Sequence, residues 1–331
     1  MATHYLYGTI LTSEAVAANN RGDNIGNTTT LQKVFHQDDL HTSVSAEAIR
    51  FALRYRFQLE DSNSVNRTYH SDTGKLLYKD EKMSYWNPSS SVYIDDDLMG
   101  FMDAEAAAKE KEDELTDEET TTKSSKAKKP QGKVTKRQSP LAIGRAVSLR
   151  PYRGELSFNC VSGEKVKGQL SLYSAEMHTT EYQYSFGLNL GDVVKKQHIG
   201  RLIDAIIDPP PVAGNHARFA YDFSPASIIL RVTNAHSSRI QNCFEHDEEN
   251  RAYTIKRLIE RVEAGDISAS ELIVGGEVSR TEEGQKLKEL GVKVEPGVYA
   301  AADEARKRIA ALGDEYKVIV PENKAAVGGA A

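Results

Sequence analysis

A strongly charged stretch without a hydrophobic pattern divides this chain of 331 residues. Residues 103–119 are mostly acidic, whereas every charged residue of 120–138 is basic. Neither half has apolar residues spaced to line one face of a helix or a strand, so we predict an insertion or linker outside the core. A basic arm that contacts phosphate is the functional alternative for residues 120–138. The core must therefore be built from the two flanking segments.

The composition is that of a folded chain, because 39% of the residues are hydrophobic. At about 150 residues per domain, the length predicts two domains or one domain with large insertions. We expect a cytoplasmic protein, because the sequence shows neither a membrane span nor a signal peptide. Only two cysteines are present, Cys160 and Cys243, which excludes a disulfide framework and a cysteine-ligated zinc site. The net charge of −6 argues against a nucleic-acid binder, but without the acidic stretch the rest is close to neutral and allows a local basic groove.

The flanking segments alternate between strand-like and helix-like patterns, which predicts an α+β fold. Ser45 is a suitable N-cap for a helix that ends at residue 60, with Ile49, Ala52, Leu53 and Phe57 as its buried stripe. We expect a long polar loop over residues 19–42. A hairpin is expected at 155–173, further helices at 197–207, 253–263 and 301–311, and strands at 4–12, 141–149, 177–190, 227–232, 271–276 and 292–296. The order strand, helix, strands, helix, strand is that of a split βαβ unit with long insertions.

The sequence offers weak candidates for catalysis. It contains no GxSxG, Walker, HExxH or GxGxxG motif. A metal could in principle be held by His36, Asp38, Asp39 and His41, but their loop spacing favours ordinary surface polarity. Consecutive aspartates at 95–97 could hold Mg²⁺, but on a strand successive side chains point to opposite faces, so we favour a charge cluster at a strand end.

RNA binding has more support from the residues. Asn19, Asn20, Arg21 and Gly22 follow the first predicted strand, and asparagine, arginine and exposed amides can contact phosphate and 2′-hydroxyl groups. The backbone amides after Ser45 form a natural anion site at the helix N-terminus. Arg50 lies one to two turns further along that helix, within reach of the same groove. A second polar loop, residues 214–218, leads toward the last strand of the split βαβ unit.

The sequence resembles the DevR-type family, whose Cas-seven group supplies the backbone subunit of type I CRISPR Cascade complexes. The resemblance is closest to the type I-B branch. It is carried by GTILTSEAVAANNRGDNIGNTTTLQKVF and HTSVSAEAIRFALR near the N-terminus. It is supported along the chain, in order, by IDDDLMGFM, SPLAIGRAVSL, HTTEYQYSFGLNL, AGNHARFAYDFSPASIILRVT and ELIVGGE.

The resemblance implies a modified RRM/ferredoxin-like palm with inserted finger and thumb regions. The first half of the palm would span residues 1–60, and a finger-type insertion at 61–140 would contain the charged stretch, 103–138. The second half would span 141–240, with a thumb hairpin at about 150–182 and an RNA-binding loop at 212–219. Residues 241–331 would form a C-terminal α/β extension.

The resemblance also implies a subunit without catalytic activity, cofactor or metal. It would polymerise head-to-tail along crRNA and present it in short segments for pairing with target DNA, in antiviral defence or RNA-guided targeting. Its partners would be crRNA, target DNA through the guide, other copies of itself and other Cascade subunits, with no membrane. Phe158 or Leu172 would be the apolar wedge of the thumb. The residues expected to contact RNA are Asn19, Asn20, Arg21, Gly22, Lys33, Ser45, Arg50, Asn215, His216 and Arg218.

Two other functions remain open from the sequence. A metal-dependent RNase of the type III backbone kind would use the aspartates at 95–97, or Asp204 and Asp208. A transcriptional autoregulator, which the family's historical name suggests, would bind duplex DNA, although the sequence shows no helix-turn-helix pattern. Cleavage of RNA paired to the guide, dependent on Mg²⁺ and on an aspartate, would establish the RNase.

Overall fold

The computed structural model describes residues 3–18, 20–36, 38–86, 92–102, 136–160, 172–213, 220–249 and 252–320. Residues 103–135, which make up most of the charged stretch, lie outside the described residues. The two ends of this segment are brought together, because β9 (Phe101–Met102) pairs antiparallel with β10 (Lys136–Arg137). The chain therefore leaves and re-enters the fold at one place, as an insertion does.

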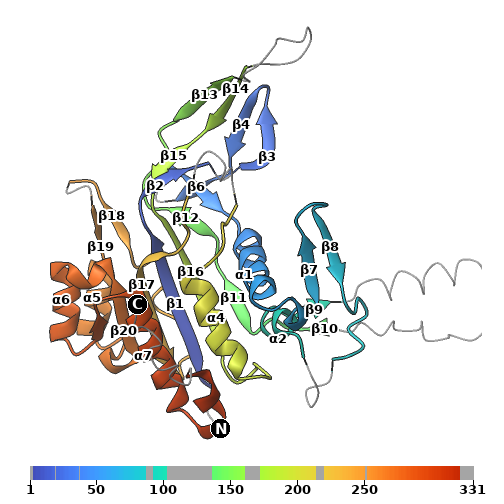
Figure 1. The fold of residues 1–331 in the computed structure, drawn as a ribbon. Coiled ribbons are helices and arrows are strands. Elements are labelled where there is room, and N and C mark those ends of the chain that lie inside the picture. The colour runs from blue at the N-terminus through green and yellow to red at the C-terminus, as the bar shows by residue number, and fades with distance from the viewer. Residues whose placement is uncertain are drawn as a thin grey trace, which may run out of the picture.

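The described residues form a sheet of nine strands that runs through the molecule (Figure 1). The strand order is β21-β20-β17-β1-β16-β12-β6-β5, with β11 also pairing with β16. All neighbours are antiparallel except β20 and β21. The strands are β1 (Tyr5–Thr12), β5 (Lys33–His36), β6 (Asp39–Val44), β11 (Leu141–Ile143), β12 (Ala146–Ser148), β16 (Tyr182–Asn189), β17 (Pro225–Thr233), β20 (Leu272–Gly276) and β21 (Lys293–Glu295).

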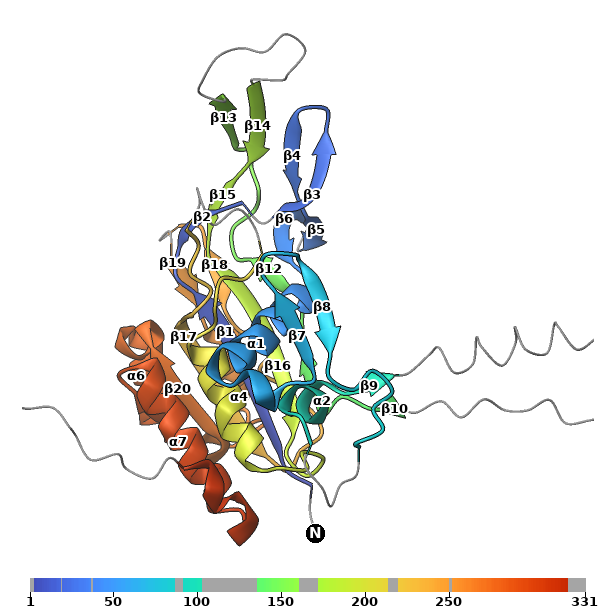
Figure 2. The same ribbon diagram turned by 45° about the vertical axis from the view of Figure 1, so that its right-hand side comes forward.

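One face of this sheet, which we call the front face, is covered by three helices (Figure 2). They are α1 (Ala46–Glu60), α4 (Gln197–Ile207) and α7 (Val298–Ala310). Successive residues of a strand point to opposite faces, so Leu6 and Ile10 of β1 meet these helices in the main core. The buried stripe predicted for α1 is confirmed, and so are the bounds of α4.

The opposite, back face carries a second core. There α5 (Lys256–Glu263) and α6 (Glu282–Glu289) pack with Ile229 of β17 and Phe244.

Short elements surround the main sheet. They are α2 (Ile94–Met99), β7 (Arg67–His70), β8 (Lys75–Tyr78), β18 (Glu245–Asp247), β19 (Ala252–Thr254), and the 3-10 turns η1 (Ser62–Ser64), η2 (Ala269–Glu271), η3 (Glu277–Arg280) and η4 (Asp314–Ile319). No helix among the described residues combines the length and apolar character that crossing a bilayer requires.

A second sheet projects beyond one end of the main sheet (Figure 1). Its order among the described residues is β13-β14-β4-β3, and we call it the lobe. Its strands are β3 (Asn20–Ile25), β4 (Thr28–Leu31), β13 (Leu156–Cys160) and β14 (Leu172–Glu176). At its base, β2 (Ala15–Ala17) pairs with β15 (His178–Thr180). The hairpin predicted at 155–173 is confirmed as an antiparallel pair, although its turn lies outside the described residues.

The long polar loop predicted at 19–42 is wrong. This segment contains β3, β4, β5 and β6. Gly26 adopts a φ of 61°, which suits the turn between β3 and β4, and the three threonines that follow have branched side chains that favour a strand. The strands are polar because they belong to a thin lobe and a sheet edge, where side chains are only partly buried.

Two further predictions are corrected in detail. The strand predicted at 141–149 is two strands, β11 and β12, separated by Gly144 and Arg145. The aspartates at 95–97 lie on α2, a helix, and not at the end of a strand. A helix fits them because acidic residues in a first turn interact favourably with the positive end of its dipole.

Candidate nucleic-acid interface

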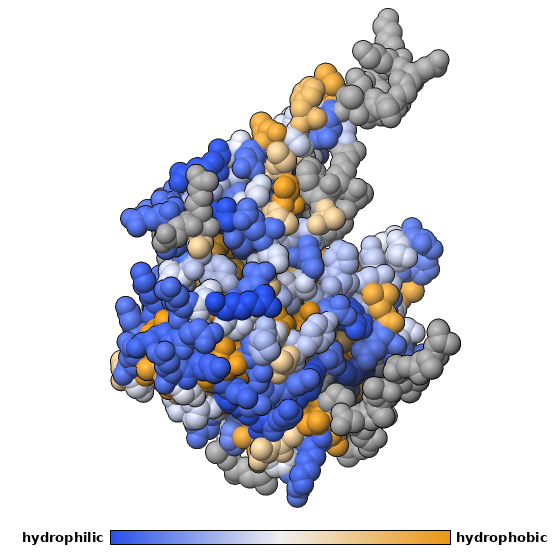
Figure 3. Space-filling model, turned by 60° about the vertical axis from the view of Figure 1, so that its left-hand side comes forward, coloured by the Kyte–Doolittle hydropathy of each residue, from blue (hydrophilic) through white to orange (hydrophobic). Residues whose placement is uncertain are grey.

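The lobe carries hydrophobic side chains on a single exposed face. Phe158 is 74% exposed, and Leu156 and Leu172 are exposed as well. Cross-strand partners in a sheet point to the same side, and the register of β13 with β14 therefore puts these three side chains on one face. The register continues through Ser174, Thr28 and Ile25, so Ile25, which is 76% exposed, joins them. Hydrophobic residues of the lobe are visible at the top of Figure 3.

This lobe face contains both residues predicted to act as the wedge. Isolated exposed apolar residues are ordinary, but several on one face of a projecting sheet mark a surface for contact with another molecule. Sequence reasoning missed Ile25, because it assigned its segment to a loop. The role of Phe158 and Leu172 as a wedge stays a prediction.

Lys33 connects the lobe to the main sheet. Its Nζ lies 2.5 Å from Oε2 of Glu176 on β14, and 5.0 Å from the centre of the Tyr152 ring. The same carboxylate oxygen accepts the backbone N–H of Leu31 at 2.7 Å. We call Lys33 and Glu176 the clasp. The ammonium group predicted to contact RNA is thus already paired with a carboxylate inside the chain.

The predicted backbone-gripping loop is only partly described. Asn20, Arg21 and Gly22 lie on β3, the edge strand of the lobe, and not in a loop. The side chains of these three residues, and Asn19 as a whole, lie outside the described part of the chain. The second predicted loop, with Asn215, His216 and Arg218, lies outside it too. Contact of these residues with RNA stays a prediction.

Ser45 and Arg50 have clear structural roles. The Ser45 side chain accepts the N–H of Ala48 at 3.2 Å, which is the predicted N-cap of α1. Arg50 donates to the backbone oxygens of Leu141 at 3.1 Å and Met99 at 2.8 Å, and burial lowers the pKa of its guanidinium. These donors of Arg50 are directed into the protein, and contact of Ser45 and Arg50 with guide phosphates stays a prediction.

A cleft of about 540 Å³ opens on the back face of the main sheet. Arg145 of β12 lies on one side of it and Arg257 of α5 on another. Arg257 pairs with Glu245, whereas Arg145 is exposed and donates to Ser43 Oγ at 3.2 Å. Among the described residues, no carboxylate lies within ion-pair distance of Arg145, although Glu47 is near enough to interact with it electrostatically. The sequence prediction did not single out this arginine, because nothing in its pattern distinguishes it from the others.

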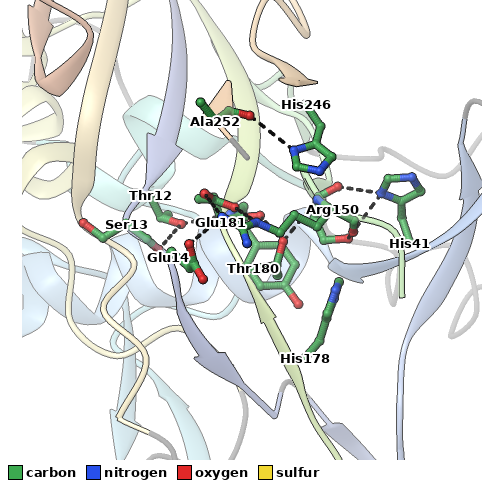
Figure 4. Close-up of polar contacts among 12 residues, drawn as sticks. Thr12, Ser13, Glu14, His41, Arg150, His178, Thr180, Glu181, His246 and Ala252 are labelled. Atoms are coloured by element: carbon green, nitrogen blue, oxygen red, sulfur yellow. Dashed lines mark hydrogen bonds and ion pairs between the residues drawn. The ribbon is translucent and has the colours of Figure 1, made fainter. Parts of the chain in front are cut away.

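Histidines gather where the lobe meets the main sheet (Figure 4). His41 Nδ1 lies 2.7 Å from the backbone oxygen of Ser148, and His178 Nδ1 lies 2.8 Å from Thr42 Oγ1. Burial lowers the pKa of both, that of His178 to about 4, so His178 is neutral at pH 7. Nearby Arg150 is paired with both Glu14 and Glu181. These groups therefore stabilise the base of the lobe and leave little unpaired charge there for a ligand.

The aspartates that were candidate metal ligands are engaged inside the fold. All three of 95–97 are buried. Asp97 pairs with Arg137 and His198, each at 2.9 Å. Asp204 pairs with Arg306, and Asp208 with Arg56 at 3.3 Å. In the part of the chain that the structure describes, no three acidic, histidine or cysteine side chains are grouped as metal ligands would be.

The sequence and the fold both match known proteins. The family model of the CRISPR-associated negative auto-regulator DevR/Csa2 matches residues 9–313. A curated relative from Myxococcus xanthus (strain DK1622), the CRISPR-associated protein Cas7/Cst2/DevR, is 36% identical over 316 residues. That match covers 92% of this chain and 97% of the relative.

Solved structures share the fold at low sequence identity. A chain of a CRISPR RNA-guided surveillance complex matches with a TM-score of 0.54 and 13% identity, covering 91% of this chain and 99% of its own length. A chain of a pre-nicking CRISPR RNA-guided surveillance complex matches with a TM-score of 0.56 and 11% identity, covering 91% and 98%. The fold and the family model thus agree along nearly the whole length. The chain belongs to the DevR/Csa2 family of CRISPR-associated proteins.

Proposed function

We propose that this protein is a backbone subunit of a CRISPR surveillance complex. Copies of it bind one guide RNA in a head-to-tail row and hold the guide in short segments for pairing with target DNA. Base pairing then reads the sequence, while the protein contacts sugar and phosphate. The subunit itself is not catalytic, and it acts in the cytoplasm together with other subunits of the complex. Family membership and the likeness to chains of RNA-guided complexes support this function.

The main sheet supports an RRM-like palm. Its central strands have the order β17-β1-β16-β11 and are antiparallel, with α1 following β1 and α4 following β16. We interpret this order as two interleaved βαβ units, with β2 to β6 inserted between β1 and α1 and with both helices on the same face. We assign residues 1–60 and 141–240 to the palm, 61–140 to the finger-type insertion and 241–331 to the C-terminal extension.

The observation that carries the proposal is the lobe face. The thumb was expected at about 150–182, and β13 and β14 lie within that range. A projecting sheet that presents Phe158 and its neighbours can separate stacked bases, because an inserted apolar side chain replaces base stacking. Regular spacing of the subunits would then interrupt the guide at regular intervals.

The test compares two exposed aromatic residues. RNA-loaded particles are prepared from the unchanged chain, from Phe158→Ala and from Tyr299→Ala, whose tyrosine is also exposed but lies on α7, away from the lobe. Chemical probing of the bound RNA should give periodic reactive bases for the unchanged chain and for Tyr299→Ala. In Phe158→Ala the periodic signal should fall while the thermal stability of the protein is kept, because an exposed side chain contributes little to folding.

Two results would contradict the proposal. RNA that is evenly reactive along its length in the unchanged particle would exclude regular interruption by this lobe. An unaltered periodic pattern in Phe158→Ala would exclude this residue as the wedge.

A further inference from the structure

We propose that the cleft on the back face binds one nucleotide of the guide RNA, with its base on the floor and its phosphate at Arg145. This inference rests on the proposed function and names a second contact, separate from the lobe face. The cleft has about 540 Å³, within the range of roughly 300–1,000 Å³ that small-molecule sites occupy.

The floor is made of small residues, which explains why the sheet is hollow there. Ala142 of β11 is paired with Gly187 of β16, and the Gly144 N–H donates to the Ser185 oxygen at 2.7 Å. A Cβ at Gly187 would lie 3.0 Å from the Tyr7 ring, so the ring lies directly against the strand. A flat, partly apolar group such as a nucleobase can approach the exposed residues Ala142 and Gly144 closely and lie beside the Tyr7 ring, which covers Gly187.

The walls have their own polar groups already satisfied. Both ends of the Gln183 amide are bonded to the backbone of Phe244, at 2.9 and 3.1 Å. The Tyr7 hydroxyl donates to the backbone oxygen of His236 at 2.7 Å. These contacts fix the shape of the cleft before any ligand arrives. At the rim, the exposed side chains of Gln241 and Asn242 can donate to and accept from a base edge.

The charges of the cleft favour one anionic group. Arg145 and Arg257 line it, and Glu245 lines it too and pairs with Arg257. Of the two arginines that the described part of the cleft contains, Arg145 is the one left for a ligand, and its planar guanidinium matches the oxygens of a phosphate. One neutral base with one phosphate fits this balance better than an acidic peptide, which would bring several charges.

The position of the cleft also suits a guide that is held by the lobe. His36 of β5 lines the cleft, and Lys33 at the other end of the same strand belongs to the clasp at the base of the lobe. A strand of RNA that leaves the lobe face along β5 would reach the cleft within one strand length.

The experiment uses RNA-loaded particles in which uridines of the guide are replaced by 4-thiouridine. After irradiation, mass spectrometry identifies the cross-linked peptides. We expect cross-links to residues 142–148 or 241–246. Arg145→Gln removes one charged hydrogen bond and should lower their yield about tenfold. Ala142→Trp fills the floor and should lower it as well. Arg280→Gln and Ala264→Trp, which alter exposed residues outside the cleft, should leave it unchanged.

The outcomes separate this inference from the proposed function. Particles that contain RNA but give no cross-links in the cleft would overturn the nucleotide site and leave the backbone role standing. Cross-links that persist at full yield in Arg145→Gln would also overturn the nucleotide site. Arg145 is exposed, so this result can be interpreted even if Ala142→Trp does not fold. Particles without RNA would overturn the backbone role, and the nucleotide site with it.

Discussion

The three aspartates of α2 bond to two different parts of the fold. Asp95 accepts the backbone N–H groups of Asn66 and Arg67, at 2.8 and 3.0 Å. Asp96 accepts the side-chain amide of Asn66 at 2.9 Å. Asp97 accepts the backbone N–H groups of Val194 and Lys195, at 2.9 and 3.0 Å. The motif therefore fastens α2 to two segments that are distant in sequence, residues 66–67 and residues 194–195.

Replacement of Asp97 should therefore destabilise the fold strongly. Asp97→Ala leaves Arg137 and His198 without their buried carboxylate, which should cost about 3–5 kcal/mol in the free energy of unfolding. The matched control is Asp208→Ala, since Asp208 is 64% exposed and its pair with Arg56 should contribute at most about 1 kcal/mol. Urea denaturation measures both. Equal effects of the two variants would show that Asp97 is not a structural residue.

The pKa of Asp97 predicts that the fold becomes less stable in strong acid. Burial acts to raise the pKa of this carboxyl, but hydrogen bonds from His198, Val194 and Lys195 lower it on balance below its ordinary 3.8. A carboxyl with a lowered pKa in the fold stabilises it above the unfolded pKa. This stabilisation is lost as the pH falls below about 3.8 toward the folded pKa.

His178 should make the protein less stable already in mild acid. Burial lowers its pKa from 6.5 to about 4, so the unfolded chain binds a proton in this range while the folded chain does not. Between about pH 7 and pH 5 this difference should cost about 2 kcal/mol. His178→Gln removes the titrating group and should show a smaller loss in urea denaturation over that range. A loss as large as in the unchanged chain would assign the effect to other groups, such as His41.

At the scale of elements, the lobe depends on few contacts. Parallel pairing between β4 and β14 joins Thr28 to Ser174 and Thr29 to Ala175. The clasp adds the contacts of Glu176 with Lys33 and with the backbone of Leu31. The exposed lobe face can therefore hold its shape only while its two hairpins stay joined.

Glu176→Gln tests this dependence. The change keeps the size of the side chain but removes the charge that holds Lys33, so β3 and β4 should exchange their amide hydrogens at least about fivefold faster. Exchange in α1 and β1, which belong to the main core, should stay the same. Uniform exchange rates in the two proteins would mean that the clasp does not hold the lobe.

Elements with a buried apolar face could be predicted from the sequence, whereas polar strands could not. The stripe of α1 and the alternation in β16 each place hydrophobic residues at the spacing of their element, and both were found. Residues 20–25 and 28–31 have no such pattern, since their strands are thinly covered, and they were assigned to a loop. The cleft could not be predicted either, because its floor joins residues of β11 and β16 that are distant in sequence.

The site residues illustrate the same division. Ser45 was found as a cap because capping is a local interaction. Lys33 and Arg50 were assigned to RNA on the basis of charge and family position, but their partners, Glu176 and the backbone of Leu141, are supplied by tertiary structure. The sequence alone does not show whether a lysine or arginine is already paired within the fold.

At the scale of the whole molecule, the charge distribution suits a protein that packs against copies of itself. The formal net charge is −6, and residues 103–119 hold nine acidic and two basic residues, so the rest of the chain has a formal charge of about +1. A strongly basic subunit would bind RNA more tightly but would repel its neighbours in a row. Contacts with phosphate still release counterions, so RNA binding by the assembled row should weaken steeply as salt is raised.

The most direct test of the backbone role is the size and RNA content of the purified protein. The chain is expressed with and without a CRISPR repeat RNA, and size-exclusion chromatography is followed by absorbance at 260 and 280 nm and by light scattering. The account predicts particles of several copies that contain protected RNA when the repeat RNA is supplied. A monomer free of nucleic acid under both conditions, even with the other subunits of the complex co-expressed, would contradict it.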